Sequence, residues 1–164
     1  MSDSTLDDKN IFKALEFGVK KWIDANGNIT KAIKLSDFQG KIKVIYCFQS
    51  WCQGCHSRGF PALKEMVTAL KGNQNIVFLS IQTVFEGHDT NTYDKILETQ
   101  KQYDLKIPFG HDSGDESSNN ISKVMINYRT GGTPWFILID QNNNVVFADF
   151  HLNVPNAINY LKKM

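Results

Sequence analysis

The chain has 164 residues, about the length of one domain and enough to bury a hydrophobic core without disulfide cross-links. Its composition is 41% hydrophobic and 12% aromatic, and its 18 Lys and Arg residues against 17 Asp and Glu leave a formal net charge of +1. This balance indicates no obligatory nucleic-acid or membrane partner. Three cysteines are too few for a disulfide scaffold, which favours a chemical role for them.

The N-terminal residues predict a cytoplasmic protein. Residues 1–8 are polar and acidic, whereas a secretory signal has a basic segment followed by roughly 7–15 apolar residues. A leader that had been removed would instead be compatible with a periplasmic protein. We expect residues 1–10 to be flexible and residues 11–164 to form a single domain.

The first half of the domain alternates helical and strand patterns. Apolar residues in 11–20 recur at helical spacing, and Asn26-Gly27 predicts a hairpin turn between short strands at 22–24 and 29–30. The apolar run 43–50 is typical of a strand buried on both faces. Residues 53–70 form an amphipathic helical pattern, in which Pro61 is expected to cause a kink.

The second half continues the alternation and ends with a hairpin and a helix. The patterns predict a strand at 75–83, a helix at 93–103, an edge strand at 106–109, a polar loop at 111–120, a helix at 121–128, strands at 135–139 and 145–147, and a helix from Pro155. Strands that alternate with helices in this way indicate an α/β fold, a three-layer sandwich around a mixed sheet.

The strand at 43–50 leads directly into Trp51-Cys52-Gln53-Gly54-Cys55 and the following helix. Two cysteines three residues apart can close a small disulfide ring. The N–H groups and the positive dipole end of the helix favour the thiolate, which is the nucleophilic form of cysteine. This segment is therefore the candidate redox site.

The chain resembles the thioredoxin superfamily, and in particular its TlpA-like or redoxin branch. The resemblance is carried by 35–41 before the strand, Ser50 to Cys55, Gly132-Thr133-Pro134, and 136–140 with its hairpin. It implies a thioredoxin-like three-layer α/β/α sandwich with a central mixed sheet and an N-terminal hairpin extension. It also implies that Cys52 is the nucleophile and Cys55 the resolving thiol.

Three further residues are implied to bind substrate. Thr133-Pro134 corresponds to the cis-proline turn that faces the two sulfurs, where the Thr133 backbone would pair with a substrate strand; a trans proline at a strand start is the alternative. Trp51 would cover the disulfide with its ring, unless it is a core aromatic at the end of the strand.

The chain departs from the family at two positions. Thioredoxins have a buried Asp six residues before the first cysteine, where this chain has Tyr46, so Glu86 after the next strand is the candidate proton acceptor for Cys55. A solvated loop residue is the alternative for Glu86. Pro61 lies nine residues after Cys52 rather than the expected eight, which leaves the helix register open.

His56 and Cys47 have several possible roles. His56 could tune the thiol pKa, complete a c-type haem attachment pattern with the two cysteines, or be a surface histidine. Cys52, Cys55 and His56 lack a fourth ligand for zinc, so we expect no metal and no bound cofactor. Cys47 is expected to pack as a core cysteine, with a backup resolving thiol as the alternative.

These observations predict a thiol–disulfide oxidoreductase that uses Cys52 and Cys55. Its partners would be a protein or small-molecule disulfide and a thiol reductant. A peroxiredoxin-type peroxidase is the first alternative, although the four residues before Cys52, 48–51, contain no proline for a peroxide site. A redox-inert binding module is the second alternative.

Overall fold

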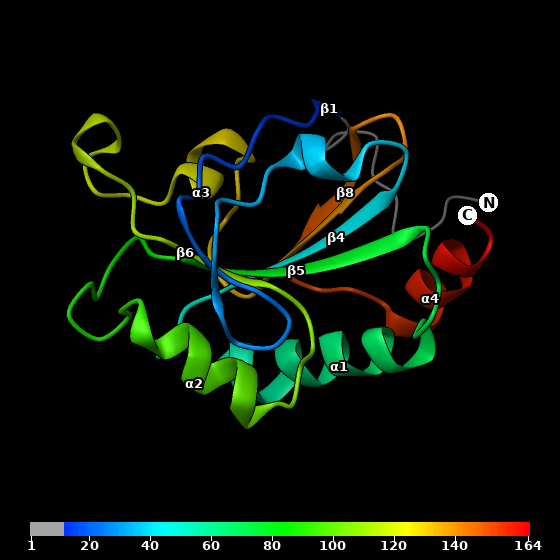
Figure 1. Ribbon diagram of the computed structural model, residues 1–164, viewed down its shortest axis with the longest axis horizontal. Coiled ribbons are helices and arrows are strands. Elements are labelled where there is room, and N and C mark those ends of the chain that lie inside the picture. The colour runs from blue at the N-terminus through cyan, green and yellow to red at the C-terminus, as the bar shows by residue number, and fades with distance from the viewer. Residues whose placement is uncertain (1–11) are drawn as a thin grey trace.

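A computed structural model describes residues 12–164 of the chain, which form one sheet covered by helices (Figure 1). The predicted flexible segment 1–10 lies outside the described residues. The strands are β1 Phe12–Lys13, β2 Lys21–Ile23, β3 Ile29–Thr30, β4 Ile42–Phe48, β5 Ile76–Thr83, β6 Phe109–Asp112, β7 Trp135–Ile139 and β8 Asn144–Asp149. The helices are α1 Phe60–Ala69, α2 Asp94–Gln102, α3 Lys123–Asn127 and α4 Val154–Lys162, with short helical turns η2 Leu35–Phe38, η3 Cys55–Gly59 and η4 Glu116–Ser118.

The strands of the sheet follow the order β1-β8-β7-β4-β5-β6-β2-β3. β4, β5 and β6 are parallel, and the strands on either side of them are antiparallel. The mixed sheet is thus confirmed. The predicted hairpin is confirmed as well, since β2 pairs with β3 around Gly27, whose φ is +85°, and the hairpin extends the sheet beside β6.

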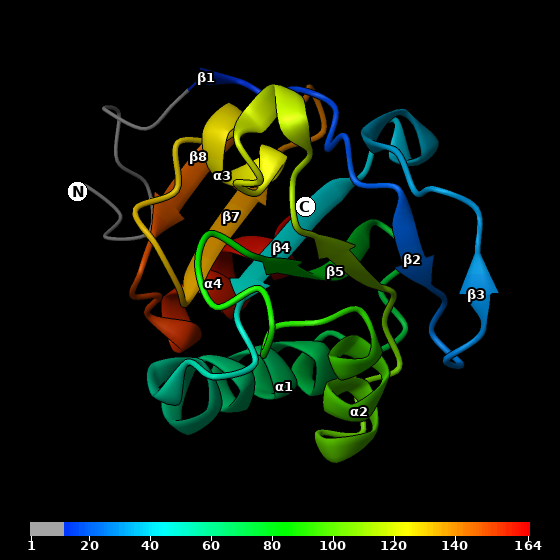
Figure 2. The ribbon, with the colours of Figure 1, turned by 90° about the vertical axis from the view of Figure 1, so that its left-hand side faces the viewer.

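Helices cover both faces of the sheet, and the outcome is the expected three-layer sandwich (Figures 1 and 2). α1, α2 and α4 pack on one face, where their apolar side chains form a core with alternate residues of β4, β5 and β7. α3, η2 and the chain between β1 and β2 cover the other face and form a second core.

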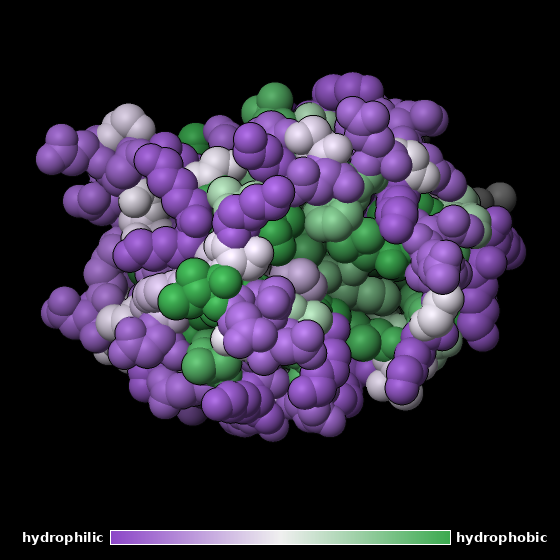
Figure 3. Space-filling view, in the orientation of Figure 1, coloured by the Kyte–Doolittle hydropathy of each residue, from purple (hydrophilic) through white to green (hydrophobic). Residues whose placement is uncertain are grey.

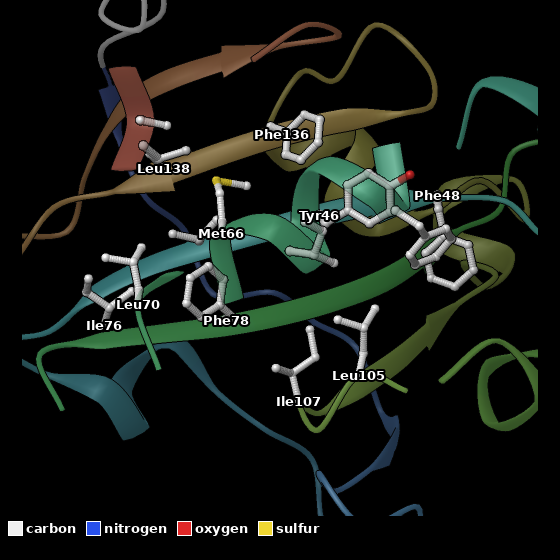
Figure 4. Close-up of a cluster of buried hydrophobic side chains, with 14 of the residues drawn as sticks. Tyr46, Phe48, Met66, Leu70, Ile76, Phe78, Leu105, Ile107, Phe136 and Leu138 are labelled. Carbon is white, nitrogen blue, oxygen red and sulfur yellow. The ribbon is translucent and has the colours of Figure 1, made fainter. Parts of the chain in front are cut away.

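β4 lies in the middle of the sheet and supplies both cores. All of its residues are buried, and successive side chains point to opposite faces. Tyr46 and Phe48 point toward α1, where Phe136 of β7 and Met66 of α1 join the same cluster (Figure 4). Cys47 points to the α3 side. This burial fixes the position and direction in which the chain leaves β4, at the start of the Cys-x-x-Cys segment.

The predicted helix at 11–20 is wrong for the described part of that segment. Phe12–Lys13 is a strand, and the residues that follow lie across the sheet without helical structure. Ala14, Phe17 and Val19 are buried, whereas Leu15, which the helical pattern placed inside, is 50% exposed. Gly18 adopts a φ of +68°, which a helix does not permit.

The predicted edge strand at 106–109 is wrong in extent and position. The strand is Phe109–Asp112, and it lies between β5 and β2, in the interior of the sheet. The sequence pattern is misleading here because His111 and Asp112 are polar. Both are buried. The Asp112 carboxylate accepts hydrogen bonds from the Ser122 hydroxyl at 2.6 Å and the Val124 N–H at 2.8 Å, at the start of α3.

The face shown in Figure 3 is mostly hydrophilic but contains an apolar hollow beside β5 and α1. Its lining includes Val67, Leu70, Ile76, Phe78 and Ile107. β6 pairs with β5 only from Ser80 onward, so the first half of β5 has no strand on this side. In the part of the chain that the structure describes, every helix is too short or too polar to cross a lipid bilayer.

Candidate functional site

Cys52 and Cys55 form a disulfide where β4 leads into helical structure. The helical conformation begins at Gln53, and the Cα atoms of the two cysteines are 5.3 Å apart. The Cys55 N–H donates a hydrogen bond to the Cys52 sulfur at 3.1 Å, as expected for a sulfur at the start of a helix. Cys52 is partly exposed and Cys55 is fully buried. A substrate can therefore reach only the first sulfur directly.

The turn after the disulfide is a π-helix, Cys55–Gly59, in which the Phe60 N–H donates to the Cys55 carbonyl five residues earlier. A π turn accommodates one residue more than an α-helical turn. This explains why Pro61 lies nine residues after Cys52 and still occupies the first turn of α1, where its missing N–H costs no hydrogen bond.

Tyr46 occupies the position of the buried Asp of thioredoxins and contacts the π turn. Its hydroxyl donates to the Cys55 carbonyl at 2.8 Å. Burial raises the pKa of Tyr46 well above its usual value, so that the hydroxyl remains a donor. A Cβ at Gly59 would lie 2.0 Å from the Tyr46 oxygen. Only glycine at position 59 allows the hydroxyl to reach the Cys55 carbonyl.

Two buried amide side chains, Gln82 and Asn91, hold the residues just before Cys52; we call this pair the amide clamp. Gln82 Oε1 accepts a hydrogen bond from the Ser50 N–H at 3.0 Å and another from the Ser50 hydroxyl. Asn91 Oδ1 accepts from the Trp51 N–H at 3.2 Å. The backbone ahead of Cys52 is thus held by the end of β5 and the loop that follows it, which lie beside it in Figure 2.

His111 on β6 contacts the side chain of Gln82, one of the two residues of the amide clamp. Gln82 Nε2 lies 3.1 Å from His111 Nδ1 and 2.9 Å from the Thr92 carbonyl oxygen, to which it donates. Burial, with a smaller effect from the Lys21 charge, lowers the pKa of His111 to about 4. The ring is therefore neutral at pH 7, and its Nδ1 accepts a hydrogen bond from the Gln82 side-chain N–H.

The amide clamp and the role of His111 were not predicted from the sequence. The available signal was Gln82 itself, a long polar residue inside a strand that is buried on both faces. Such a residue needs a hydrogen-bond partner, but the sequence does not show where the partner lies.

His56 connects Ser50, two residues before Cys52, to Tyr103 at the end of α2. Its Nε2 is 2.6 Å from the Ser50 carbonyl oxygen, and its Nδ1 is 2.5 Å from the Tyr103 hydroxyl. Because the carbonyl only accepts, Nε2 carries a hydrogen. Burial raises the pKa of Tyr103, which favours its hydroxyl as the donor to Nδ1. Among residues 12–164, no three His, Cys, Asp or Glu side chains gather as a metal site requires.

Trp51 and Glu86 lie near each other at the loop after β5. The Trp51 side chain is 47% exposed and is not a core aromatic; a Cβ at Gly87 would be 2.6 Å from its ring. Glu86 precedes Gly87 and is exposed. This exposed position is that of a solvated loop residue, and the role of Glu86 as proton acceptor for Cys55 stays a prediction.

The peptide bond between Thr133 and Pro134 is cis, as predicted from the resemblance. The Pro134 ring faces the Cys-x-x-Cys turn, since its Cδ lies 3.5 Å from the position of a Cβ at Gly54. The cis-proline turn thus lies beside the Cys-x-x-Cys turn, although about 80 residues separate the two segments in the chain.

Cys47 is a free, fully buried thiol that packs in the core on the α3 side of the sheet. Cys55 belongs to the core on the opposite side. Burial raises the pKa of the Cys47 thiol far above its usual value. The interpretation as a core cysteine is confirmed, and a backup resolving role is not compatible with this position.

Comparison with known proteins places the chain in a family. A family model described as AhpC/TSA family matches residues 13–148. The thiol-disulfide oxidoreductase ResA of Bacillus cereus is 27% identical over 116 residues, which are 71% of this chain and 58% of that protein. The chain thus spans somewhat more than half the length of this curated relative.

Solved structures show the same fold. A thioredoxin-like superfamily protein matches with a TM-score of 0.79 and 27% identity over 92% of this chain and 94% of that one. A thiol-disulfide isomerase from Corynebacterium glutamicum matches with a TM-score of 0.76 and 25% identity over 90% and 94% of the two chains. Because the family match covers most of the sequence and the fold agrees, this protein belongs to the AhpC/TSA family of the thioredoxin superfamily.

Proposed function

We propose that the protein is a thiol–disulfide oxidoreductase that exchanges its Cys52–Cys55 pair with protein disulfides. The observation that carries this proposal is a disulfide with one accessible sulfur at the start of a helix, facing a cis-proline. The similarity to ResA and to the thiol-disulfide isomerase supports it.

The reaction starts from the reduced pair. The Cys52 thiolate attacks one sulfur of the substrate disulfide, a mixed disulfide forms, and the other substrate sulfur leaves as a thiolate. Cys55 then loses its proton and attacks the Cys52 sulfur, which forms the Cys52–Cys55 disulfide and releases the second substrate thiol. A thiol reductant supplies the two electrons that restore the reduced pair.

The surroundings of the pair suggest a role for each neighbouring group. The Cys55 N–H, which points at the Cys52 sulfur, stabilises the thiolate. The Thr133 backbone and the exposed Trp51 ring would contact the substrate chain beside its disulfide. Glu86 is the proposed proton acceptor for Cys55, although its side chain is exposed while Cys55 is buried. Glu86→Gln tests it: an unchanged rate of mixed-disulfide resolution would assign the proton to solvent.

Peroxidase activity is the competing function within the family. A 2-Cys peroxiredoxin from Plasmodium vivax matches with a TM-score of 0.66 at 16% identity, which reflects the fold alone. The pairing of Cys52 with a cysteine three residues away favours dithiol chemistry, and no proline precedes Cys52 within 48–51.

Insulin reduction with dithiothreitol as electron donor tests the proposal. The wild-type protein and the matched control Cys47→Ser are expected to accelerate the reduction, whereas Cys52→Ser is expected to lose the effect. Cys55→Ser is expected to accumulate a mixed disulfide with the substrate. Peroxide consumption that exceeds disulfide reduction under the same donor would instead support the peroxidase, and activity in neither assay would favour a redox-inert binding module.

The direction of the reaction depends on the compartment. We propose a cytoplasmic location, in which glutathione and thioredoxin would keep the pair mostly reduced and the protein would act as a reductant. Alkylation of free thiols in rapidly quenched cells measures the redox state of the pair. A mostly oxidised pair would contradict this location and direction.

A further inference from the structure

A surface pocket of about 150 Å³ opens beside the cis-proline turn. A cavity of this size accommodates one group about as large as benzene. The pocket can therefore hold a single side chain rather than a segment of chain. Its lining consists of Arg58, Gly59, Ala62, Pro134, Phe136, Phe150, His151 and Leu152.

The pocket adjoins the reacting sulfurs. Arg58 Nη2 and Pro134 Cδ each lie 3.5 Å from the position of a Cβ at Gly54, which is the residue just before Cys55. Two of the lining residues are thus in contact with the Cys-x-x-Cys turn. A substrate whose disulfide reaches Cys52 would place a neighbouring side chain within reach of the pocket.

The lining has an apolar wall and a basic rim. Pro134, Phe136 and Leu152 provide apolar surface, and Arg58 and His151 are the charged or titratable residues of the lining, which contains no carboxylate. Asp149 is close in sequence, but it is not part of the lining, and its carboxylate accepts the Phe150 N–H at 2.6 Å.

The Arg58 guanidinium is exposed and unpaired in the described part of the chain. None of the ion pairs within residues 12–164 includes it. An arginine side chain has a planar set of donors that matches a carboxylate group. The pocket itself supplies no carboxylate, so the guanidinium is free to bind one that a ligand brings.

We propose that this pocket is a specificity subsite for a glutamate next to the cysteine that Cys52 attacks. The methylene groups of the glutamate would lie against the apolar wall, and its carboxylate would bind Arg58. The inference rests on the proposed thiol–disulfide exchange and adds to it the class of substrate, a disulfide flanked by acidic residues. Arg58 would select the substrate and take no part in the exchange of sulfurs.

The selectivity is expected to be moderate and to depend on salt. Exposed ion pairs contribute little, and arginine–carboxylate pairs contribute more when both groups are held in place. We therefore expect a preference of about twofold to fivefold in kcat/KM for a glutamate peptide over its glutamine counterpart. High ionic strength is expected to reduce the preference.

The experiment compares disulfide-bridged peptides that differ only in the residue next to the cysteine. Glutamate, glutamine and lysine are placed directly before or directly after the cysteine, and kcat/KM is measured for each peptide. The proteins are wild type, Arg58→Gln, Arg58→Lys and Lys71→Gln. Lys71 is a matched control for lost charge because it lies just past the end of α1, is exposed, and is not part of the pocket lining.

The expected result is a glutamate-to-glutamine ratio of kcat/KM that falls to about 1 in Arg58→Gln, is partly kept in Arg58→Lys, and is unchanged in Lys71→Gln. Equal kcat/KM values for all peptides with the wild type would overturn the subsite. A reduced rate with an unchanged ratio in Arg58→Gln would also overturn it, because Arg58 would then act on the cysteines. Failure of the proposed function is distinct, since the wild type would then reduce none of the peptides.

Discussion

Replacing Gly59 by alanine is expected to destabilise the protein by about 2 kcal/mol, although the local backbone alone would favour the substitution. Gly59 has φ −67° and ψ −54°, which is ordinary helical geometry. At such a position the exchange usually stabilises a protein by about 0.4–1 kcal/mol. The sign of the effect therefore separates backbone preference from packing.

The opposing contribution comes from Tyr46. The new Cβ would lie 2.0 Å from the Tyr46 oxygen and 2.7 and 2.8 Å from two of its ring carbons, which no real side chain tolerates. The ring cannot move away easily, because it is fully buried between Phe60 and Phe136, with centroids at 4.8 and 5.0 Å.

The magnitude follows from two costs and one gain. Overpacking in a dense core costs about 1–3 kcal/mol. Loss of the hydrogen bond from Tyr46 to the Cys55 carbonyl costs about 0.5–1.5 kcal/mol. The gain from backbone preference offsets about 0.4–1 kcal/mol of this. The net loss in the free energy of unfolding is therefore about 2 kcal/mol.

Urea unfolding of the oxidised protein measures this loss, with Tyr46→Phe and the double variant as controls. Tyr46→Phe removes the atom nearest to the new Cβ, so Gly59→Ala should cost about 1 kcal/mol less in that background. An alanine variant that is as stable as the wild type, or more stable, would refute the close contact between the π turn and Tyr46.

Three more predictions concern the free energy of unfolding and the buried thiol. The pKa of His111 is lowered to about 4 in the folded protein, so between about pH 6.5 and 4 the unfolded state binds a proton that the folded state does not. The free energy of unfolding is therefore unaffected by His111 above about pH 6.5 and falls by up to about 3 kcal/mol as the pH decreases to about 4. His111→Gln should flatten this part of a urea-unfolding series, and an equally steep series would contradict the assignment. Asp112→Ala should cost about 2–4 kcal/mol by the same method, because the hydrogen bonds that the buried carboxylate accepts from Ser122, Lys123 and Val124 are lost; a cost below about 1 kcal/mol would show that these hydrogen bonds are dispensable. In a variant without the two site cysteines, Cys47 should react with an alkylating reagent at least about 100-fold more slowly in folded than in urea-unfolded protein, and similar rates would show that it is accessible.

The sequence by itself determined the elements whose signal is local. The apolar run before Cys52 is typical of a strand buried on both faces, and a Cys-x-x-Cys between such a strand and a helix indicates where a redox pair lies. The hairpin around Gly27 followed from turn chemistry. The alternation of strand and helix patterns indicated the fold class. The cis bond before Pro134 followed from the resemblance, which combines several local signals in one order.

Tertiary structure decided what depends on partners distant in the chain. His111 and Asp112 looked like loop residues, yet β6 is an interior strand because the β2–β3 hairpin pairs with it. The helical pattern at 11–20 was overridden, since Gly18 and the nearby sheet favour an extended path. A periodic pattern shows that a face is buried but not what buries it.

The same limit applies to the site. The hydrogen bonds from Ser50 and Trp51 to Gln82 and Asn91 join segments 32 and 40 residues apart. Tyr46 replaces the expected carboxylate and stabilises the turn through the Cys55 carbonyl rather than by accepting a proton. Local residue order specified the positions of the two sulfurs. The packing of distant segments determined which groups hold the chain around them, because side-chain hydrogen bonds depend on distances that spacing in the sequence does not encode.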